Sequence, residues 1–351
     1  MASDDRIALW QITSTVLPII AISIGLGIAT QSLSAQTLAL SAALFVLLVL
    51  FLSRSFSLMH DCGHQSLFRS KSANRIAAFF LSLIHGMPHH PWSRGHAFHH
   101  KHNGNWDRYR GPSALITRQK FDQKTDSSKR LYKILRHPLL LFPGGFFYLI
   151  VKPRATLLLG FFEFSLHSIR GCLKDICSGQ LPDFGAIAAS HKSNFFYTKG
   201  EAIDTTLNTI CVALLWWWAG SAIGYVHFWV LYFLVMSTSA ALMIAVFFIQ
   251  HNFPGSYASS EEDWSYFKGA LEGSSFLQMP ALLNWFTADI AYHHIHHLSE
   301  RIPNYRLSQC HQANLHLLGG VRRLRLSEIS TCFSLILWDR DKLELTTTTA
   351  G

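Results

Sequence analysis

Histidine is unusually common in this chain, and its placement suggests metal chemistry. The 351 residues include 20 histidines against 21 acidic residues. Three motifs concentrate them: His60-Asp-Cys-Gly-His64, His96-Ala-Phe-His99-His100 and His293-His-Ile-His296-His297. Because positions i, i+3 and i+4 of a helix lie on one face, each motif would present two or three imidazoles to a common point. Neutral imidazole is the commonest metal ligand, so this spacing predicts metal binding.

The three motifs together supply eight imidazoles, more than one ion can bind, and therefore predict two metal ions. Neighbouring cations repel each other, and an oxygen species that bridges them would offset this repulsion. His251 follows a long apolar stretch and is expected to be a ninth ligand. A single HxxxH pair often arises by chance, and a histidine-rich tract can bind metal loosely. Three short, spaced motifs favour a built site over both alternatives.

Other residues near the motifs could orient the ligands without binding a metal ion. Asp61 and Asp289 are candidates to accept the far N–H of a ligating imidazole, although a surface or capping role is an equally simple interpretation of each. On a helix, His294 would point about 100° away from His293. We therefore expect His294 to support the site rather than to ligate. The histidines outside the motifs are expected to be structural, supporting or solvent-exposed.

Two long stretches without charged residues indicate the helices that must position these histidines. Residues 7–53 and 205–260 contain no Asp, Glu, Lys or Arg. A helix needs roughly 20 apolar residues to cross the hydrocarbon of a bilayer, so each stretch predicts a hairpin of two spans. We place the spans near residues 7–29, 36–56, 206–220 and 227–250. Buried helices of a soluble protein are the alternative, but core helices of this length normally carry a polar face.

The Lys and Arg residues indicate which side of the membrane the connecting segments occupy. Residues 53–200 hold 21 of the 30, residues 251–351 hold eight, and the turns inside both hairpins hold none. By the positive-inside rule, the N-terminus and residues 57–200 and 251–345 are cytoplasmic. The prediction is an all-α integral membrane protein of one domain (residues 1–351). It has four transmembrane helices in two hairpins, and a cytoplasmic helical cap that carries a dimetal site.

Three apolar stretches inside the cap need a separate interpretation. Residues 76–87, 131–151 and 156–169 are apolar, and the last two have basic flanks. Such flanks fit helices that lie at the membrane surface. Full spans are the alternative, but only an added pair of spans would keep all three histidine motifs on one face.

The net charge of +9 is explained by this topology. A basic cap would lie close to anionic lipid headgroups, which attract each nearby Lys or Arg by about 1 kcal/mol. Nucleic acid is not expected as a partner, because no nucleic-acid-binding motif accompanies the charge.

The three motifs, in this order and spacing, resemble the histidine boxes of membrane fatty acid desaturases. The closer likeness is to bacterial and cyanobacterial acyl-lipid desaturases of the omega-6 (delta-12) type. It is carried by His60-Asp-Cys-Gly-His64, by Gln250-His251-Asn252-Phe253 and, most specifically, by the run from Leu283 to Tyr305. The resemblance covers roughly residues 50–330. The boxes alone mark the wider superfamily, which includes hydroxylases and ketolases.

The resemblance implies a reaction, its cofactors and its partners. Two iron ions would be held by His60, His64, His96, His99, His100, His251, His293, His296 and His297. With dioxygen as co-substrate, the enzyme would insert a cis double bond into the acyl chains of membrane lipids. Relatives also use a side-chain amide near the ninth histidine through water, and Asn252 is a candidate here. Leu141-Phe-Pro-Gly-Gly145 lacks the His of a fused haem domain's HPGG motif, so the electron donor would be a separate protein such as ferredoxin.

Chemical reasoning agrees with this implication and leaves two alternatives. Removing hydrogen from an unactivated methylene needs an oxidant that only a cofactor can provide. Imidazole ligands alone do not select iron, whereas zinc is redox-inert. A related hydroxylase or ketolase, acting on a lipid or a carotenoid, would share the motifs. A metal transporter is disfavoured, because the interiors of the four expected spans contain no Asp, Glu, Lys or Arg.

Overall fold

Four long helices follow one another along the chain in two pairs, which we call the first and second hairpins. The computed structural model describes residues 2–32, 34–108 and 115–348. The first hairpin consists of α1 (Asp5–Ala29) and α2 (Ala35–Gly63), and the second of α10 (Lys199–Ile223) and α11 (Tyr225–Ile249). Asp4 caps α1 by accepting from the backbone N–H groups of Arg6 and Ile7, and Ser34 forms a capping box with Thr37 at the start of α2.

The observed helix bounds differ from the expected spans in two useful ways. The helix α2 continues past Phe56 to Gly63, so His60 lies on its last turns and His64 is its C-cap. The turn expected at residues 221–226 is a single residue, Gly224, whose φ of +88° lies in the region that favours glycine. The first histidine motif is therefore carried by the end of a long helix rather than by a cap segment.

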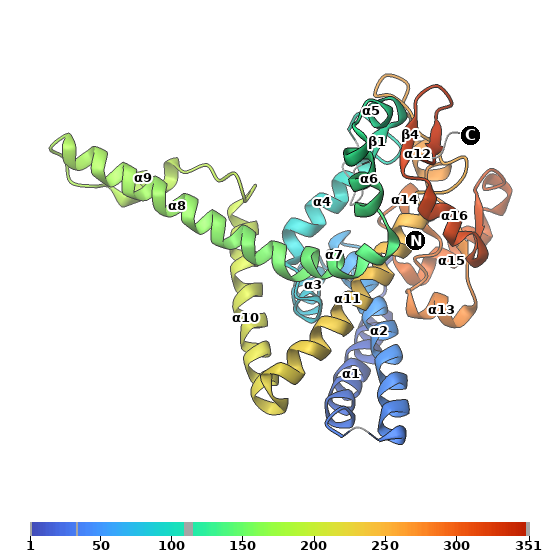
Figure 1. Ribbon diagram of the computed structural model, residues 1–351, viewed down its shortest axis with the longest axis horizontal. Coiled ribbons are helices and arrows are strands. Elements are labelled where there is room, and N and C mark those ends of the chain that lie inside the picture. Colours follow the sequence, from blue (N-terminus) through green and yellow to red (C-terminus); the bar gives the residue numbers. More distant parts are fainter. Residues whose placement is uncertain (1, 33, 109–114, 349–351) are drawn as a thin grey trace.

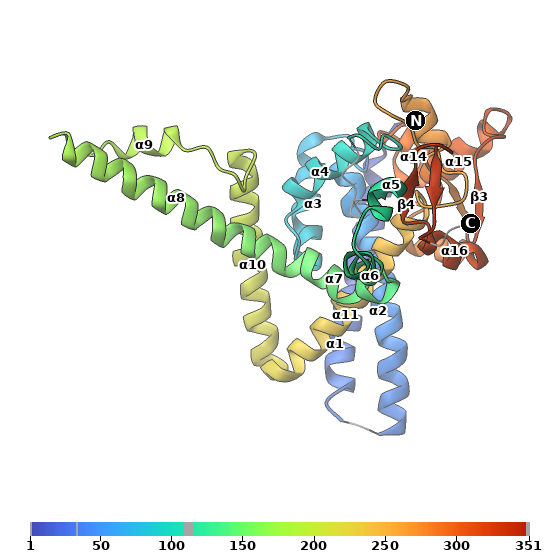
Figure 2. The same cartoon turned by 45° about the horizontal axis from the view of Figure 1, so that its top comes forward.

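A fifth segment also has the length and apolar composition of a membrane span. The candidates in the described chain are α1, α2, α10, α11 and the segment Pro138–Cys177. That segment contains η1 (Pro138–Leu140), α7 (Leu141–Phe146), the π-helical turn η2 (Phe147–Val151) and α8 (Lys152–Cys177). Figures 1 and 2 show α8 running across the direction of α1, α2 and α10 and projecting sideways from them.

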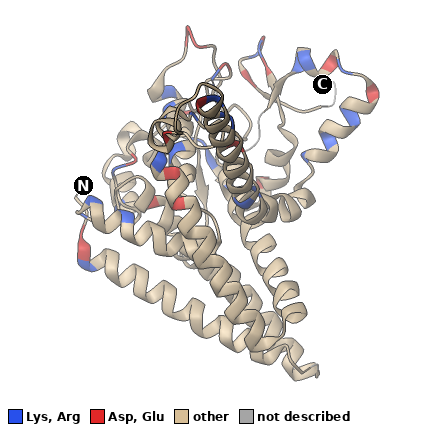
Figure 3. Cartoon of the chain, turned by 90° about the vertical axis from the view of Figure 1, so that its left-hand side faces the viewer, with Lys and Arg blue, Asp and Glu red and all other residues tan. Residues whose placement is uncertain are grey.

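The second hairpin packs on α7 and on the first hairpin through small and apolar residues. The helix α7 lies tightly against α11, since a Cβ on Gly145 would come within 2.6 Å of the Cβ of Ala240. Leu58 and Met59 of α2 are fully buried in the main core, which also includes Met236 and Met243 of α11. Figure 3 shows the charged residues gathered towards one end of the molecule, while the far ends of the long helices carry none.

The charged end is built from many short helices that surround the ends of α2 and α11. The first half of the chain contributes α3 (Lys71–His85), α4 (His89–Lys101), α5 (Arg118–Asp122) and α6 (Asp126–Leu135). The helix α9 (Phe184–Ser190) lies apart from this end, beside α8 (Figure 1). The second half contributes α12 (Tyr266–Leu271), α13 (Ala281–Phe286), α14 (His293–Leu298), α15 (Asn304–Ala313), η3 (Leu315–Leu317), η4 (Leu326–Glu328) and α16 (Ile329–Ser334).

Two small sheets correct the expectation of an all-α chain. The strand β4 (Leu337–Asp339) pairs in parallel with β1 (Ile116–Thr117) and antiparallel with β5 (Glu344–Thr346). In the other sheet, β2 (Phe276–Gln278) and β3 (Arg323–Arg325) are parallel. Strands this short carry no period-2 pattern that a sequence could show. Buried leucines on β2, β3 and β4 fasten the C-terminal segment to the cap.

Candidate metal centre

The helices bring the nine expected ligands together as two groups. The first histidine group contains His60, His64, His96, His100 and His296. The second histidine group contains His99, His251, His293 and His297. In each group, one ring nitrogen of every member lies within 4.8 Å of the corresponding atoms of the others. The prediction of two metal-binding positions therefore has a structural counterpart.

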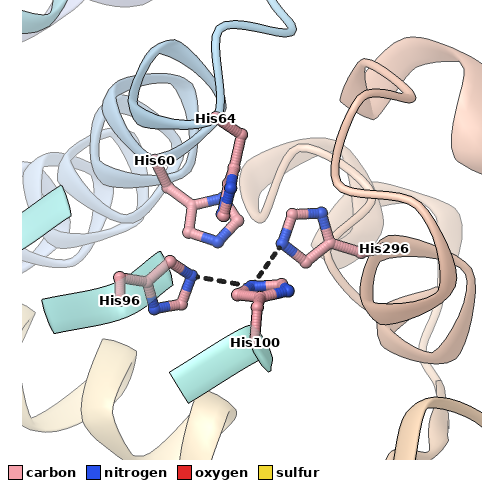
Figure 4. A group of neighbouring side chains, drawn as sticks. All are labelled: His60, His64, His96, His100 and His296. Atoms are coloured by element: carbon pink, nitrogen blue, oxygen red, sulfur yellow. Dashed lines mark hydrogen bonds between the residues drawn. The ribbon is translucent and has the colours of Figure 1, made fainter. Parts of the chain in front are cut away.

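The first histidine group draws its members from three elements, α2, α4 and α14 (Figure 4). His100 Nε2 lies 3.0 Å from His96 Nε2 and 3.1 Å from His296 Nε2. The His60 ring centroid is 4.5 Å from that of His296, and the His64 centroid is 4.5 Å from that of His100. Figure 4 shows the rings turned towards a common centre.

All four members of the second histidine group are buried, and one of them, His251, lies two residues after the end of α11. His251 Nε2 lies 3.1 Å from His99 Nε2 and 2.9 Å from His293 Nε2. His297 Nε2 lies 3.1 Å from His293 Nε2. His99 and His100, adjacent on α4, thus belong to different groups, so a single helix contributes to both positions.

These distances between ring nitrogens fit imidazoles that bind a common metal ion better than imidazoles that hydrogen-bond to each other. A neutral imidazole has one N–H, which is too few to pair every converging Nε2 in a group. Ligand atoms roughly 2.0–2.1 Å from one ion, as in zinc–imidazole sites, stand about 3 Å apart when they are neighbours. The Nδ1 atoms of His100, His293, His296 and His297 are also buried without a hydrogen-bond partner in the described chain. The donor set therefore suits metal ions that prefer nitrogen ligands.

Burial keeps these rings in the form that binds metal. Removal from water, reinforced by neighbouring imidazoles, holds the pKa of the six ligand candidates on α4 and α14 well below the usual value. Burial also lowers the pKa of His251 to about 4. The rings are then neutral at physiological pH and offer a lone pair without first losing a proton.

Two contacts outside the groups fix the orientation of ligand rings. His64 Nδ1–H donates to Glu300 Oε2 at 3.0 Å, and this bond lowers the pKa of Glu300, so the carboxylate is charged. His251 Nδ1 lies 2.9 Å from the carbonyl oxygen of Gly273. Partners of this kind set the tautomer and direction of a ligating imidazole. Glu300 was missed by the sequence reasoning, although it lies inside the Leu283–Tyr305 run, three residues after His297.

Asp61 lies beside a ligand candidate, as expected. Its Oδ1 is 3.5 Å from His60 Nδ1, and its Oδ2 accepts hydrogen bonds from the backbone N–H and side-chain amide of Asn304 at 2.7 and 2.9 Å. The Asn304 amide in turn exchanges hydrogen bonds with that of Gln11 in α1. A buried polar chain therefore runs from α1 through Asn304 to the residue next to His60.

The other three supporting candidates have their main contacts elsewhere. The charge beside Asp289 is that of Arg54, and burial raises the pKa of Asp289 to about 6. His294 Nε2 lies 2.9 Å from His311 Nδ1, so this buried ring faces away from both groups. The Asn252 amide donates to the Leu335 carbonyl at 2.9 Å and ties the end of α11 to the C-terminal segment. Each contact joins residues far apart in sequence, which local spacing could not predict.

A largely apolar cavity of about 650 Å³ borders both histidine groups. Its lining includes His96 of the first group and His99 and His251 of the second. The Trp92 ring, also part of the lining, stacks on His96 with centroids 4.9 Å apart. The Phe247 ring lies 5.6 Å from the rings of both His60 and His293. The volume is within the range of small-molecule pockets.

Comparison with known proteins gives this geometry a context. The family model described as fatty acid desaturase matches residues 37–326. A protein of Bacillus subtilis named fatty acid desaturase is 29% identical over 311 residues, which cover 86% of this chain and 76% of the relative. The sn-1 oleoyl-lipid 12-desaturase of a Picosynechococcus species is 26% identical, with 73% of this chain and 63% of the relative covered. The chloroplastic sn-2 acyl-lipid omega-3 desaturase (ferredoxin) of Helianthus annuus is 25% identical, with 76% and 54% covered.

Proposed function

The chain belongs to the fatty acid desaturase family, and from this premise we propose the reaction in full. It is an oxygen-dependent membrane oxidoreductase that inserts a cis double bond into the acyl chains of lipids. The observation that carries the proposal is the pair of buried histidine groups, of five and four members, beside a largely apolar cavity. A cavity of this kind suits a hydrocarbon chain, and the two groups suit two metal ions.

The proposed metal is iron, with the nine histidines as ligands. Two iron ions bound there would supply, from dioxygen and two electrons, an oxidising power that no side chain has. The choice of iron rests on the family and on the reaction, because imidazole also suits zinc, copper and nickel. The second histidine group is more enclosed than the first, in which His64 and His96 are only partly buried.

The chain's own residues would bind and shield the substrate. Trp92 and Phe247 present aromatic faces to the cavity beside the histidines, and Phe56, Met243 and Ile244 add apolar walls. Such a lining would hold a methylene group close to both histidine groups and exclude water from the reacting atoms. Glu300 would hold the His64 ring in place through the Nδ1–H bond.

We propose that the chain is a single domain that crosses the membrane four times, through α1, α2, α10 and α11. His99 precedes α10 and His251 follows α11, yet their Nε2 atoms are 3.1 Å apart. The chain must therefore cross an even number of times between them. Two crossings are supplied by α10 and α11, which favours placing Pro138–Cys177 outside the set of spans. The Lys and Arg distribution supports the proposal that the histidine groups lie on the cytoplasmic face.

A separate protein would deliver the electrons, and ferredoxin is the proposed donor. The printed name of the Helianthus annuus relative includes ferredoxin, and the cap of this chain is basic. A basic surface attracts an acidic carrier and raises the rate of encounter.

Profiling of lipid fatty acids tests the proposal. Wild type, His96→Ala and the control His316→Ala are expressed with iron and an electron donor in a host that lacks desaturases. Mass spectrometry of the methyl esters should show a new double bond with wild type and with His316→Ala, whose histidine is exposed and outside both groups. It should show none with His96→Ala.

Two other outcomes would contradict the proposal. Folded, iron-loaded wild type that yields no new double bond would exclude desaturation of the host's lipids. Oxygenated acyl products or carotenoids would instead identify a hydroxylase or ketolase.

A further inference from the structure

A long helical arm directly precedes α10 in the chain and contributes no residue to the histidine groups. The arm (residues 152–198) consists of α8, the returning helix α9 and the segment that leads into α10. Figures 1 and 2 show it reaching sideways, away from the other helices. At about 1.5 Å per residue, the 26 residues of α8 cover roughly 39 Å.

Contacts at its base fix the direction of the arm. The Arg154 guanidinium donates to the carbonyl oxygen of Gly86 and, at 3.1 Å, to Asn208 Oδ1 of α10. It also lies over the Trp216 ring, 5.3 Å from the ring centroid. Because these partners belong to α10 and to the C-cap of α3, Arg154 ties the start of the arm to the other helices.

One side of α8 is covered by the returning chain. Glu163 accepts from the Ser193 hydroxyl at 3.0 Å and from the Asn194 backbone N–H at 3.2 Å. His167 Nε2 lies 3.0 Å from the Ile187 carbonyl oxygen of α9. The polar groups on this side of α8 therefore find their partners within the arm.

The other side of α8 carries an apolar stripe that the described part of the chain leaves largely exposed. Its members follow one another at intervals of four or three residues and so share one face of the helix: Leu158, Phe162, Leu166, Ile169, Leu173 and Ile176. Leu158 is 70% exposed and Ile176 is 58% exposed at the two ends. At the tip of the arm, Leu181 is 93% exposed. Exposed apolar area of this extent marks an interaction surface.

We propose that the stripe is buried in the cytoplasmic leaflet and that the arm lies in the plane of the membrane surface. This inference rests on the proposed four-span topology, which leaves α8 on the cytoplasmic side. The helix α8 packs against α10, whose exposed Leu207, Ile210 and Leu214 would also face lipid. The arm also carries five Lys and Arg against three Asp and Glu. A net positive charge favours an anionic leaflet over a second copy of the same arm.

The arm would thereby set the height of the substrate cavity. Lys152, Pro153 and Thr156 at its base, with Phe195 and Phe196 of the returning segment, form part of the cavity lining. An arm held in the leaflet keeps this wall level with the acyl chains that the enzyme uses.

Spin labels at defined positions measure where the arm lies. The parent carries serine in place of the four cysteines that are not buried, Cys172, Cys177, Cys211 and Cys310. Leu158→Cys, Phe162→Cys, Ile169→Cys and Ile176→Cys sample the stripe. Lys174→Cys samples the polar side, and Leu214→Cys provides a label on a proposed span. Each full-length variant is labelled in vesicles of neutral and anionic phospholipid, and its collisions with oxygen and with a water-soluble nickel complex are compared.

The proposal expects all four stripe labels at one shallow depth, about 5–10 Å below the headgroup boundary, with Lys174→Cys in water. A steady change of depth from residue 158 to 176, which would total about 27 Å in a spanning helix, would overturn it. So would stripe labels that meet nickel as freely as Lys174→Cys does. Labels shielded from both reagents and broadened by each other would indicate a second copy instead.

This measurement is independent of the chemistry. Iron content equal to that of the parent shows that each variant is folded and loaded. The depth readings remain valid even if lipid profiling reveals no desaturation. Conversely, depth readings that overturn the proposed position of the arm would leave the result of the lipid profiling unchanged.

Discussion

The bond between Glu300 and His64 provides a direct test of how the first histidine group is held. Glu300→Gln keeps the shape of the side chain but replaces a charged acceptor of the His64 Nδ1–H bond with a neutral amide. Removing a carboxylate that orients a ligating imidazole typically weakens metal binding by about 10–100-fold. The Glu300 side chain is 42% exposed, so solvent screens part of its charge. We therefore expect the lower end, about tenfold or ~1.4 kcal/mol.

The assay is chelator competition on purified, iron-loaded protein, with bound iron measured by elemental mass spectrometry. Wild type should hold two ions. Glu300→Gln should release one of them at about tenfold lower chelator concentration, while the ion of the second histidine group stays bound. Glu261→Gln is the matched control, because Glu261 is 45% exposed, pairs with Arg108 at 2.8 Å and belongs to neither histidine group. Equal iron retention by Glu300→Gln and Glu261→Gln would refute the reasoning.

Three further predictions follow from contacts of the same region. The single variants His99→Ala and His100→Ala should each lose tight binding of one ion, and the double variant should lose tight binding of both ions. Loss of both ions in each single variant would contradict the division into two groups. Asn304→Ala removes one of the two hydrogen bonds to Asp61 Oδ2 and leaves the buried Gln11 amide without its partner. It should lower the free energy of unfolding by about 1–3 kcal/mol and reduce the thermal midpoint, whereas the exposed-site variant His316→Ala should not. Burial raises the pKa of Asp289 to about 6, so the folded state binds this proton more tightly than the unfolded state does and loses stability as pH rises between about 4 and 6. The thermal midpoint of Asp289→Asn should therefore rise relative to that of wild type over this interval. A difference that stays constant with pH would show that the pKa of Asp289 is not raised.

The histidine ligands were accessible to sequence reasoning because their information is local. Each motif places its rings on one helical face, and all nine expected residues lie in the two groups. The division between groups was not accessible. His99 and His100 point to different centres because α4 lies between the ends of α2 and α11, and this depends on how three helices are rotated against each other.

The other features that the sequence did not predict depend on contacts between residues far apart in the chain. Glu300 reaches His64 across more than two hundred residues of chain, and Asn252 and His294 find their partners in the C-terminal part. The segment Pro138–Cys177 has the composition of a span, and only its direction in space and the pairing of His99 with His251 argue against that role. Strands of two or three residues, such as β1 and β4, depend on a partner strand rather than on their own sequence.

The distribution of ligands along the chain also dictates an order of maturation. A chain synthesised as far as residue 250 already contains four members of the first histidine group but only His99 of the second. His251 adds one more, and neither group is complete before α14, which supplies His293, His296 and His297. The second group therefore has only two of its four histidines until α14 has been synthesised. A chain truncated before α14 would contain all four long helices and yet leave neither histidine group complete.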